Sequence, residues 1–270
     1  MNTDEFEFIS QLLKKRSGLA LTADKTYLLE SRLLPIARTF KIETLPEFVR
    51  FIRSKPDEKV IAQVVDAMTT NESMFFRDQK PFDQFRQVIL PRLKEVKGGG
   101  KIRIWSAACS NGQEPYTIAM CLLEEAVKMS GFTYEIIATD ISPRVLEKAK
   151  QGIYTQFEIQ RGLPIQMLLK YFKQLPDSTW QANENLRSMV TFRQQNLLEE
   201  IGMLGKFDII LCRNVLIYFD EPTKRGILEK ISRMLEKHGV LLLGSTETIL
   251  GISDKYITLE NERGVHVLAA

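Results

Sequence analysis

Polar side chains stand at the ends of three predicted strands, where they could bind a ligand. A turn of small residues, Ala107–Pro115, follows the first strand and contains Glu114. Asp140 ends the second strand, and Asn196 follows the third. The carboxyl ends of parallel strands meet at one edge of an open α/β sheet, and ligands bind at that edge. A carboxylate there can accept hydrogen bonds from both ribose hydroxyls, and an amide can pair with the edge of an adenine. The pattern indicates a nucleotide-like ligand.

The turn after the first strand favours a ligand other than a dinucleotide. It contains one glycine, Gly112, whereas a pyrophosphate cradle would carry three. Small residues let a ligand approach the backbone closely. Glu114 adds a negative charge that repels phosphate and suits a cationic ligand such as the amino-acid end of S-adenosylmethionine. Two alternatives stay open: Ala107–Pro115 is an ordinary turn, or Asp140 caps the next helix, a role that Ser142 could also fill.

Histidine and cysteine restrict the chemistry. The chain contains two histidines, His238 and His266, which disfavours both a zinc site and a Ser-His-Asp relay. We therefore expect a reaction that needs neither a metal nor an imidazole base. The cysteines, Cys109, Cys121 and Cys212, are odd in number and widely spaced, which indicates thiols in a reducing compartment. Cys212 lies in a buried-looking strand, so we expect a packing residue.

The composition is that of a globular protein with room for two domains. The chain has 270 residues, of which 44% are hydrophobic and 26% are charged. A net charge of +3 indicates no strong nucleic-acid footprint. No apolar run reaches the length of a membrane span, and the acidic start Met1–Glu5 differs from a signal peptide. We expect a cytoplasmic monomer without nucleic-acid partners or membrane insertion.

The first hundred residues predict helices. Apolar residues recur at helical spacing, and Thr44–Glu47 has the pattern of a capping box with proline in the first turn. Pro35 predicts a kink or a frayed helix end, and Gly98–Gly100 ends the helical half. The expected helices run up to Gly18, over 24–38, from 45 to before Pro56, over 57–68 and over 80–96.

From Lys101 onward, strands alternate with helices. Strands are expected over 102–107, 134–140, 190–192, 207–212 and 240–244, with helices over 115–129, 143–150 and 222–237. Segments 256–260 and 265–268 predict an antiparallel hairpin. Segment 154–189 breaks the rhythm, so we expect a small subdomain inserted between the second and third parallel strands. The predicted fold class is α/β: a Rossmann-like doubly wound sheet with an antiparallel edge hairpin, preceded by a small all-α domain.

Four long motifs carry a family resemblance. They cover almost the whole chain in order, with similar spacing: Thr69–Asp78, Trp105–Tyr116, Ala138–Ser142 and Cys212–Asp220. The sequence resembles the CheR-type chemotaxis receptor protein-glutamate O-methyltransferases. The resemblance implies an N-terminal helical domain over 1–72, a linker and connecting helix over 73–97, and an S-adenosylmethionine-dependent methyltransferase domain over 98–270 with an inserted β-subdomain at about 154–189.

The resemblance also implies an activity and a set of site residues. The activity is methyl transfer from S-adenosylmethionine to glutamate side chains of chemoreceptors (methyl-accepting chemotaxis proteins), which gives glutamate methyl esters and S-adenosylhomocysteine during adaptation in bacterial chemotaxis. Arg77 and Tyr218 match the two residues proposed for the reacting centre. The positions expected to contact S-adenosylmethionine are Asn71, Ser73, Arg77, Glu114, Asp140, Asn196, Leu197, Arg213 and Asn214.

The chemistry of this reaction suits these residues. A glutamate with an ordinary pKa of about 4.3 is ionised at neutral pH, so methyl transfer to it requires no base. Arg77 could hold a carboxylate through two hydrogen bonds, that of the cofactor, that of the acceptor or each in turn. Tyr218 could donate a hydrogen bond to an acceptor oxygen. The alternatives are a surface ion pair of Arg77 with Asp78 or Glu72, and a half-buried Tyr218 beside Phe219.

Basic residues on the second helix suggest a docking surface for the receptor. Arg32 and Arg38 lie six residues apart, with Arg50 and Arg53 nearby. By the resemblance, Arg32 and Arg38 match positions implicated in substrate recognition in the family. Receptor helices are acidic around their methylation sites, so a basic face would complement them. Pro35 departs from the family pattern, in which this position is often basic. The alternative is an ordinary solvated face.

The inserted subdomain lacks a feature that some family members use. Those members bind a short peptide at the receptor's C-terminus through a glycine-containing insertion. Segment Phe172–Trp180 contains no such glycine and is a few residues short. We therefore predict that this enzyme acts independently of that peptide tether.

Two rival functions differ from this reading. The first is a methyltransferase that acts on nucleic acid or on a small molecule. Enzymes that methylate amino groups of DNA usually carry an Asn/Asp-Pro-Pro-Tyr/Phe segment after the fourth strand, and Arg213–Tyr218 lacks both prolines. A silent module that binds S-adenosylmethionine and regulates a partner would be indicated by the loss of Arg77 or Tyr218. Both residues are present.

Overall fold

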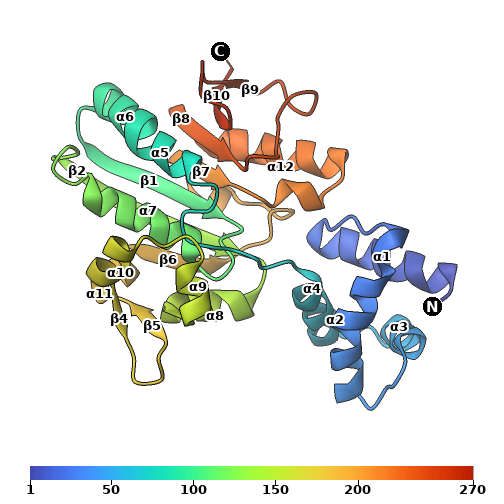
Figure 1. Ribbon diagram of the computed structural model, residues 1–270. Coiled ribbons are helices and arrows are strands. Elements are labelled where there is room, and N and C mark those ends of the chain that lie inside the picture. The colour runs from blue at the N-terminus through green and yellow to red at the C-terminus, as the bar shows by residue number, and fades with distance from the viewer. Residues whose placement is uncertain (270) are drawn as a thin grey trace. The chain divides into compact units, whose positions relative to one another are not determined.

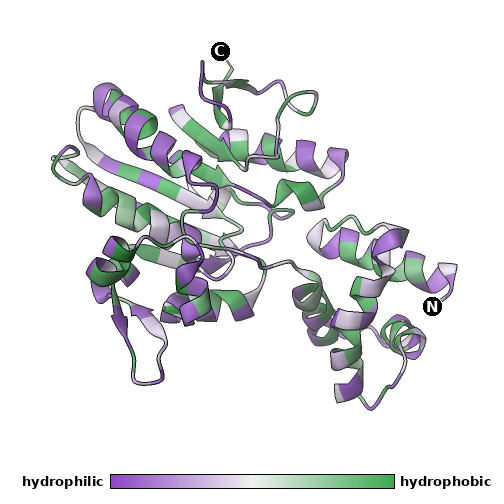
Figure 2. Cartoon of the chain, viewed as in Figure 1, coloured by the Kyte–Doolittle hydropathy of each residue, from purple (hydrophilic) through white to green (hydrophobic). Residues whose placement is uncertain are grey.

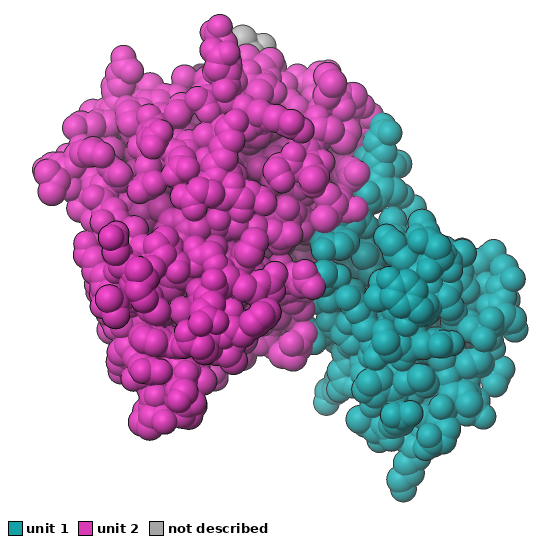
Figure 3. Space-filling model, viewed as in Figure 1, with its two compact units in different colours: residues 1–70, 218–223 teal, residues 71–217, 224–270 magenta. Residues whose placement is uncertain are grey.

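The computed structural model describes residues 1–269, which form two compact units. The first, here called the helical unit, consists of residues 1–70 together with 218–223 (teal in Figure 3). The second, the sheet unit, consists of residues 71–217 and the described chain from 224 onward (magenta in Figure 3). Each unit has its own secondary structure and its own buried residues.

The helical unit is built from short capped helices (Figure 1). Asn2 and Glu5 form a capping box at the start of the first helix, and Gly18, with a φ of 78°, ends it. Pro35 lies inside the second helix. The α-helices are α1 Thr3–Ser17, α2 Thr26–Thr39, α3 Leu45–Ser54 and α4 Glu58–Met68, with a 3-10 turn η1 Ala23–Lys25. The all-α prediction for this part of the chain is confirmed.

The apolar faces of these helices make the core of the helical unit. Helix α2 packs with α3 and α4, and Leu29 and Leu33 of α2, Phe48 of α3 and Val64 of α4 are fully buried. Helices in Figure 2 carry alternating hydrophilic and hydrophobic bands, as expected when one face of each helix is buried.

The expected helix over 80–96 is divided into three segments. They are α5 Lys80–Gln84, the π-helical segment η2 Phe85–Ile89 and α6 Leu90–Lys97. In the π segment the N–H of Leu90 donates to the carbonyl of Phe85, one residue further back than in an α-helix. The next residue, Pro91, has no N–H and its ring would clash with a carbonyl one turn earlier, so a wider turn is favoured at this point.

The sheet unit contains a seven-stranded sheet in the order β6-β2-β1-β7-β8-β10-β9. Strands β6, β2, β1, β7 and β8 run parallel, and β10 and β9 are antiparallel at one edge. The Rossmann-like sheet with an antiparallel edge hairpin is therefore confirmed. The strands are β1 Gly100–Ala107, β2 Phe132–Asp140, β6 Val190–Gln194, β7 Phe207–Cys212, β8 Leu235–Leu243, β9 Tyr256–Thr258 and β10 Val265–Leu268.

Three long helices connect the parallel strands. They are α7 Gln113–Glu124, α8 Pro143–Gln151 and α12 Glu221–Met234. Both α7 and α12 end earlier than expected: turns follow α7, and β8 begins directly after α12. Every residue of β7 is buried, as is typical of a parallel strand with both faces covered.

A small antiparallel sheet lies between β2 and β6 in the chain. Its strands are β3 Ile153–Tyr154, β4 Phe172–Gln174 and β5 Trp180–Ala182, in the order β3-β5-β4. The short helices α9 Gln156–Gln160, α10 Ile165–Tyr171 and α11 Glu184–Arg187 accompany them. A tight turn joins β4 to β5, in which the N–H of Ser178 donates to Leu175 and Ser178 has a φ of 66°.

Candidate functional site

The loop after β1 is tied to the end of β2. The N–H of Cys109 donates to the carbonyl of Thr139 (2.9 Å), and the N–H of Ser110 donates to Oδ2 of Asp140 (2.9 Å). Ala108 and Ser110 both have positive φ angles, of 56° and 51°. Such backbone strain at the end of a parallel strand is typical of a ligand-binding loop.

Asp140 lies at the carboxyl end of β2 with 5% of its surface exposed. Its carboxylate accepts the N–H of Ser110 at one oxygen and the N–H of Ser142 at the other (3.0 Å). The cap of α8 is Ser142, whose hydroxyl accepts the N–H of Val145 (3.3 Å). Asp140 therefore fixes the two loops at the strand end, and the capping role belongs to Ser142.

Asn196 and Leu197 follow β6, the neighbour of β2. The register pairs Asp140 with Gln194, so Asn196 leaves the sheet beside Asp140. The side-chain oxygen of Asn196 accepts the N–H of Leu198 (3.0 Å), which shapes the loop, and Leu197 is buried. The structure thus brings three predicted contact residues to adjoining strand ends.

Arg213, at the end of β7, is a buried connector with 1% of its side chain exposed. Its guanidinium donates to Glu114 (2.9 Å), to the carbonyl of Arg77 (2.7 Å) and to Asp78 (3.2 Å). It also lies over the ring of Phe82, 5.1 Å from the centroid. One side chain therefore joins the start of α7, the end of β7 and the segment before α5.

The negative charge that Glu114 presents to a ligand is smaller than expected for a free carboxylate. Its carboxylate accepts the hydroxyl of Ser106 (2.7 Å) as well as the guanidinium of Arg213. The negative charge expected after β1 is present, but Arg213 offsets it in the structure. The arrangement provides a fixed carboxylate with both oxygens already engaged, one by Ser106 and the other by Arg213.

The segment that contains Asn71, Ser73 and Arg77 lies against the β1–α7 loop. The carbonyl of Asn71 accepts the hydroxyl of Ser110 (2.8 Å), and the half-buried Ser73 follows two residues later. Phe75 is fully buried, with its ring edge against Tyr154 at a centroid distance of 5.0 Å. These contacts hold the segment from Asn71 to Arg77 against the β1–α7 loop, so the two segments form neighbouring sides of the site.

A strained turn presents Arg77. Phe76, Asp78 and Gln79 have φ angles of 50°, 66° and 39°. The Arg77 guanidinium donates to the carbonyl of Glu72 (2.9 Å), and among residues 1–269 it makes no ion pair with Glu72 or Asp78. The surface ion pair considered as the alternative for Arg77 is therefore absent from the described chain, because Asp78 pairs with Arg213.

Glu247 is a site residue that the sequence analysis missed. Its carboxylate accepts four backbone N–H groups, from Gly244, Asn214, Val215 and Leu216, at 2.7–3.0 Å. These bonds hold the loop after β7, in which Asn214 has a φ of 57°. A Cβ at Gly244 would stand 2.9 Å from the side-chain Nδ2 of Asn214 and 3.0 Å from its backbone nitrogen. The sequence signal that could have identified Glu247 is its position as a charged residue shortly after the end of a buried strand.

Tyr218 belongs to the helical unit, whereas Arg77 belongs to the sheet unit. Tyr218 ends the 3-10 turn η4 Leu216–Tyr218, and its carbonyl accepts the N–H of Ala20 (2.9 Å). The side chain is half-buried. Its role at the reacting centre stays a prediction.

The arginines of the expected docking surface have different environments. The Arg32 guanidinium donates to the carbonyls of Met68 (2.8 Å) and Thr69 (3.3 Å) at the end of α4. Arg50 pairs with Glu5 and Arg53 with Asp4, whereas the exposed Arg38 has no ion pair within residues 1–269. The relevant N–O distances are 2.9 Å for Arg50 and 2.6 Å for Arg53.

The two histidines have structural partners. His238 contacts Oδ1 of Asp208 (2.6 Å) at the amino ends of β7 and β8, opposite the loops at the carboxyl ends of the parallel strands. His266, in β10, contacts the Thr258 hydroxyl (3.2 Å), and burial lowers its pKa to about 4. The part of the chain that the structure describes contains no group of His, Cys, Asp and Glu residues arranged to hold a metal, and no helix that could span a membrane.

The three cysteines are buried thiols. Burial raises the pKa values of Cys109 and Cys212 well above the ordinary value, and raises that of Cys121 to about 12. A buried, protonated thiol is a poor nucleophile. These environments agree with packing roles.

Comparison with known proteins relates both units to one family. The profile described as "CheR methyltransferase, all-alpha domain" matches residues 4–69, and "CheR methyltransferase, SAM binding domain" matches residues 71–265. A chemotaxis protein methyltransferase of Vibrio anguillarum is 38% identical over 98% of this chain and 96% of its own length. Chemotaxis protein methyltransferase 1 of Pseudomonas aeruginosa is 40% identical over 97% of this chain and 96% of its own length.

Proposed function

This chain belongs to the CheR methyltransferase family, and we propose that it transfers the methyl group of S-adenosylmethionine to glutamate side chains of chemoreceptors. The products are glutamate methyl esters and S-adenosylhomocysteine. The observation that carries the proposal is the set of strand-end loops joined by Arg213 and Asp140. The names of the relatives, chemotaxis protein methyltransferases, support the receptor as the substrate.

The side chains at the strand ends fit S-adenosylmethionine. Asp140 would hold the ribose hydroxyls, and Asn196 with the buried Leu197 would hold the adenine. Small residues with positive φ in the β1–α7 loop let a ligand lie close to the backbone. Asn71, Ser73, Arg77, Glu114, Arg213 and Asn214 complete the proposed set. When bound, the cofactor supplies an electrophilic methyl group on a positively charged sulfur.

The protein's contribution is positioning and the exclusion of water. A glutamate carboxylate is ionised at neutral pH and needs no base. In agreement, the two histidines contact other residues, His238 with Asp208 and His266 with Thr258. Charge is neutralised as the methyl moves, so removal of water favours the reaction. Alignment can contribute roughly 7–11 kcal/mol. We propose that Arg77 holds a carboxylate and that Tyr218 orients an acceptor oxygen.

We also propose that the activity is independent of a C-terminal receptor peptide. The β4–β5 connection is a tight turn without glycine, closed by hydrogen bonds between Leu175 and Thr179 and between Ser178 and Leu175. This short turn leaves no room for the longer, glycine-containing insertion that would bind such a peptide. Titration calorimetry with the C-terminal peptide of a tethered receptor should give no tight binding, and a micromolar dissociation constant would contradict this part of the proposal.

Mass-spectrometric mapping tests the substrate directly. The full chain is incubated with S-adenosylmethionine and a chemoreceptor cytoplasmic fragment, and peptides are searched for added methyl groups. Methylation confined to glutamates, and lost when those glutamates are replaced by aspartate, is expected. Methylation of lysine or of added nucleic acid instead would contradict the proposed substrate.

A further inference from the structure

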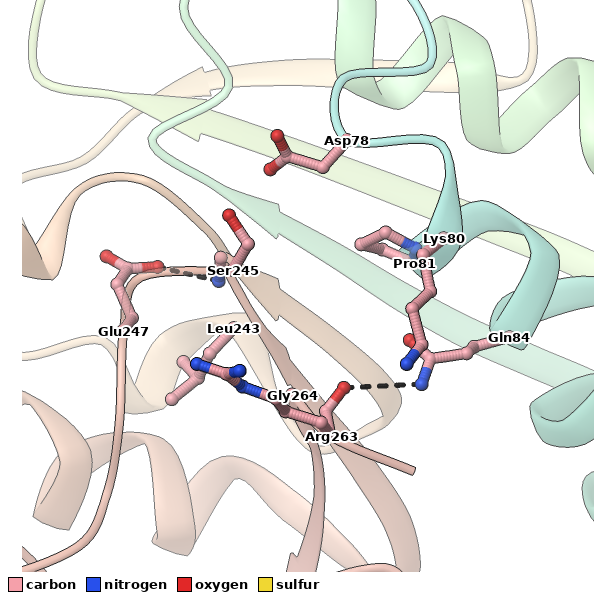
Figure 4. Close-up of a pocket in the computed structure, with 10 residues that line it drawn as sticks. Asp78, Lys80, Pro81, Gln84, Leu243, Ser245, Glu247, Arg263 and Gly264 are labelled. Carbon is pink, nitrogen blue, oxygen red and sulfur yellow. Dashed lines mark hydrogen bonds between the residues drawn. The ribbon is translucent and has the colours of Figure 1, made fainter. Parts of the chain in front are cut away.

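The sheet unit contains a pocket of about 220 Å³ that the proposed cofactor site does not use (Figure 4). One wall is the segment from Asp78 to Gln84, and the other consists of the end of β8 and the turn before β10. Figure 4 shows the carboxyl of Asp78 and the hydroxyl of Ser245 directed into the space between these walls. The polar side chains that line the pocket are those of Asp78, Lys80, Gln84, Ser245, Glu247 and Arg263.

The walls are fixed to each other by a buried side chain. Gln84, with 6% of its surface exposed, donates to the carboxylate of Glu262 (2.7 Å) and to the carbonyl of Arg263 (3.2 Å). The dashed line at Arg263 in Figure 4 marks the second of these bonds. The turn that carries Arg263 is thereby held against α5, so the pocket is built into the unit.

The pocket presents two cations without matching anions. Asp78 is engaged by Arg213 (3.2 Å), and Glu247 by its four backbone N–H donors. Within residues 1–269, the side chains of Lys80 and Arg263 have no ion-pair partner. The carboxylates that line the pocket are therefore satisfied, and the cations are available for a bound anion.

The pocket adjoins Arg77 and Asn214, two proposed S-adenosylmethionine contacts of the sheet unit, on the side away from the proposed adenine and ribose contacts. Asp78 follows Arg77 directly, and Glu247 holds the backbone of Asn214. The pocket lies at the end of β8, whereas Asp140 and Asn196 follow β2 and β6 across the sheet. An acceptor protein that approaches from the β8 side would meet this pocket beside its reacting glutamate.

On the basis of the proposed function, we propose that this pocket binds a second carboxylate of the acceptor protein, an acidic side chain near the glutamate that is methylated. The reacting carboxylate loses its charge as the methyl group is transferred, so it is not a charge that Lys80 and Arg263 could hold equally in the ground state and the transition state. A neighbouring carboxylate keeps its charge throughout. Lys80 and Arg263 would then strengthen substrate and transition-state binding equally, which lowers KM and leaves kcat unchanged.

Steady-state kinetics on the full chain test the pocket. The variants are Lys80→Gln, Arg263→Gln and their combination, and the substrate is a receptor cytoplasmic fragment at low and high salt. We expect the KM for receptor to rise about ten-fold in the double variant at low salt, with kcat and the Kd for S-adenosylmethionine unchanged. Lys128→Gln and Arg233→Gln, on exposed surfaces elsewhere in the sheet unit, are the matched controls.

A substrate series identifies the occupant. Acidic residues that flank the methylated glutamate are replaced singly by glutamine, and one replacement should raise KM in the wild type but have no further effect in the double variant. An unchanged KM in the double variant, a lower kcat or a weaker affinity for S-adenosylmethionine would overturn the proposal. If the wild type makes no glutamate ester on receptor, the proposed function fails, and the pocket proposal fails with it. If it makes the ester and the variants match the controls, only the pocket proposal fails.

Discussion

Arg213 and Glu114 are joined by a hydrogen bond of 2.9 Å, although 99 positions separate them in the chain. The Arg213 side chain is 1% exposed and that of Glu114 13%, so the pair is shielded from water. Both residues are proposed to contact S-adenosylmethionine. Their pairing means that the site is held together by the same charges that would bind the ligand.

We predict that Glu114→Gln destabilises the protein in the absence of cofactor. The substitution leaves the buried Arg213 guanidinium with one carboxylate partner, Asp78, which costs on the order of 3 kcal/mol. Urea unfolding without ligand measures the change in the free energy of unfolding. The double variant Glu114→Gln with Arg213→Met should recover part of the loss. A single variant within about 0.5 kcal/mol of wild type would contradict the structural role of the pair.

We predict that Glu247→Ala impairs turnover by about 100-fold, because misplacement of a site loop by about 1 Å can cost that factor. The substitution removes the common acceptor of four N–H groups and releases the backbone of Asn214. Methyl-transfer assays and cofactor-binding calorimetry measure the effect. Glu260→Ala, which removes an exposed carboxylate in the same unit, is the control. Equal activities of the two variants would show that Glu247 does not position the loop.

We predict that Arg77→Ala and Tyr218→Phe reduce turnover while the fold stays intact. Arg77→Ala removes the proposed carboxylate ligand, and Tyr218→Phe removes one hydroxyl donor, which corresponds to a loss of about ten-fold. Kinetics and circular dichroism separate activity from folding. Tyr27→Phe, at a tyrosine that is 65% exposed, controls for the loss of a hydroxyl. Wild-type rates in both site variants would refute the proposed roles.

We predict that Arg38→Glu and Arg32→Glu differ in their effects. Arg38 is exposed and has no ion pair within residues 1–269, so its reversal should raise the KM for receptor about five-fold at low salt. Arg32 donates to carbonyls at the end of α4, so its reversal should also lower the melting temperature. Lys15→Glu, an exposed cation of α1, is the control. Arg38→Glu kinetics equal to those of the control would remove Arg38 from the docking surface.

We predict that His266 makes the protein less stable in acid. Burial lowers its pKa from 6.5 to about 4, so the unfolded chain binds a proton that the folded protein does not. Above pH 6.5 His266 is neutral in both the folded and the unfolded chain, so it causes no loss of stability there. As the pH drops from 6.5 toward 4, the free energy of unfolding falls by on the order of 3 kcal/mol. Denaturant unfolding across this range measures it. In His266→Leu this part of the pH dependence should disappear, and an unchanged slope would contradict the assignment.

Local patterns predicted much of the fold. The amphipathic helix α3 and the buried strand β7 follow the periodicities of their apolar residues, and Thr44 caps α3 as its sequence indicates. The convergence of Asp140 and Asn196 also followed from the sequence, because the carboxyl ends of neighbouring parallel strands share one edge. These features depend on residues close together in the chain or on a general rule of sheets.

The remaining site features depend on contacts between distant segments. No local pattern shows that Arg213 bridges α7 and the turn at Asp78, or that Arg32 bonds the end of α4. Glu247 acts through the backbone of residues about 30 positions earlier, and backbone hydrogen bonding to a carboxylate leaves no periodic signal. Long-range contacts of this kind decide which charges are available to a ligand.

The most direct test of the central claim is the chemical nature of the transferred methyl group. The protein is incubated with methyl-labelled S-adenosylmethionine and a chemoreceptor cytoplasmic fragment, and the labelled receptor is then treated with alkali. A carboxyl methyl ester releases its label as volatile methanol, and we predict this result. Label that stays on the receptor after alkali would mean transfer to nitrogen or another atom, and would contradict the proposed glutamate O-methyltransferase activity.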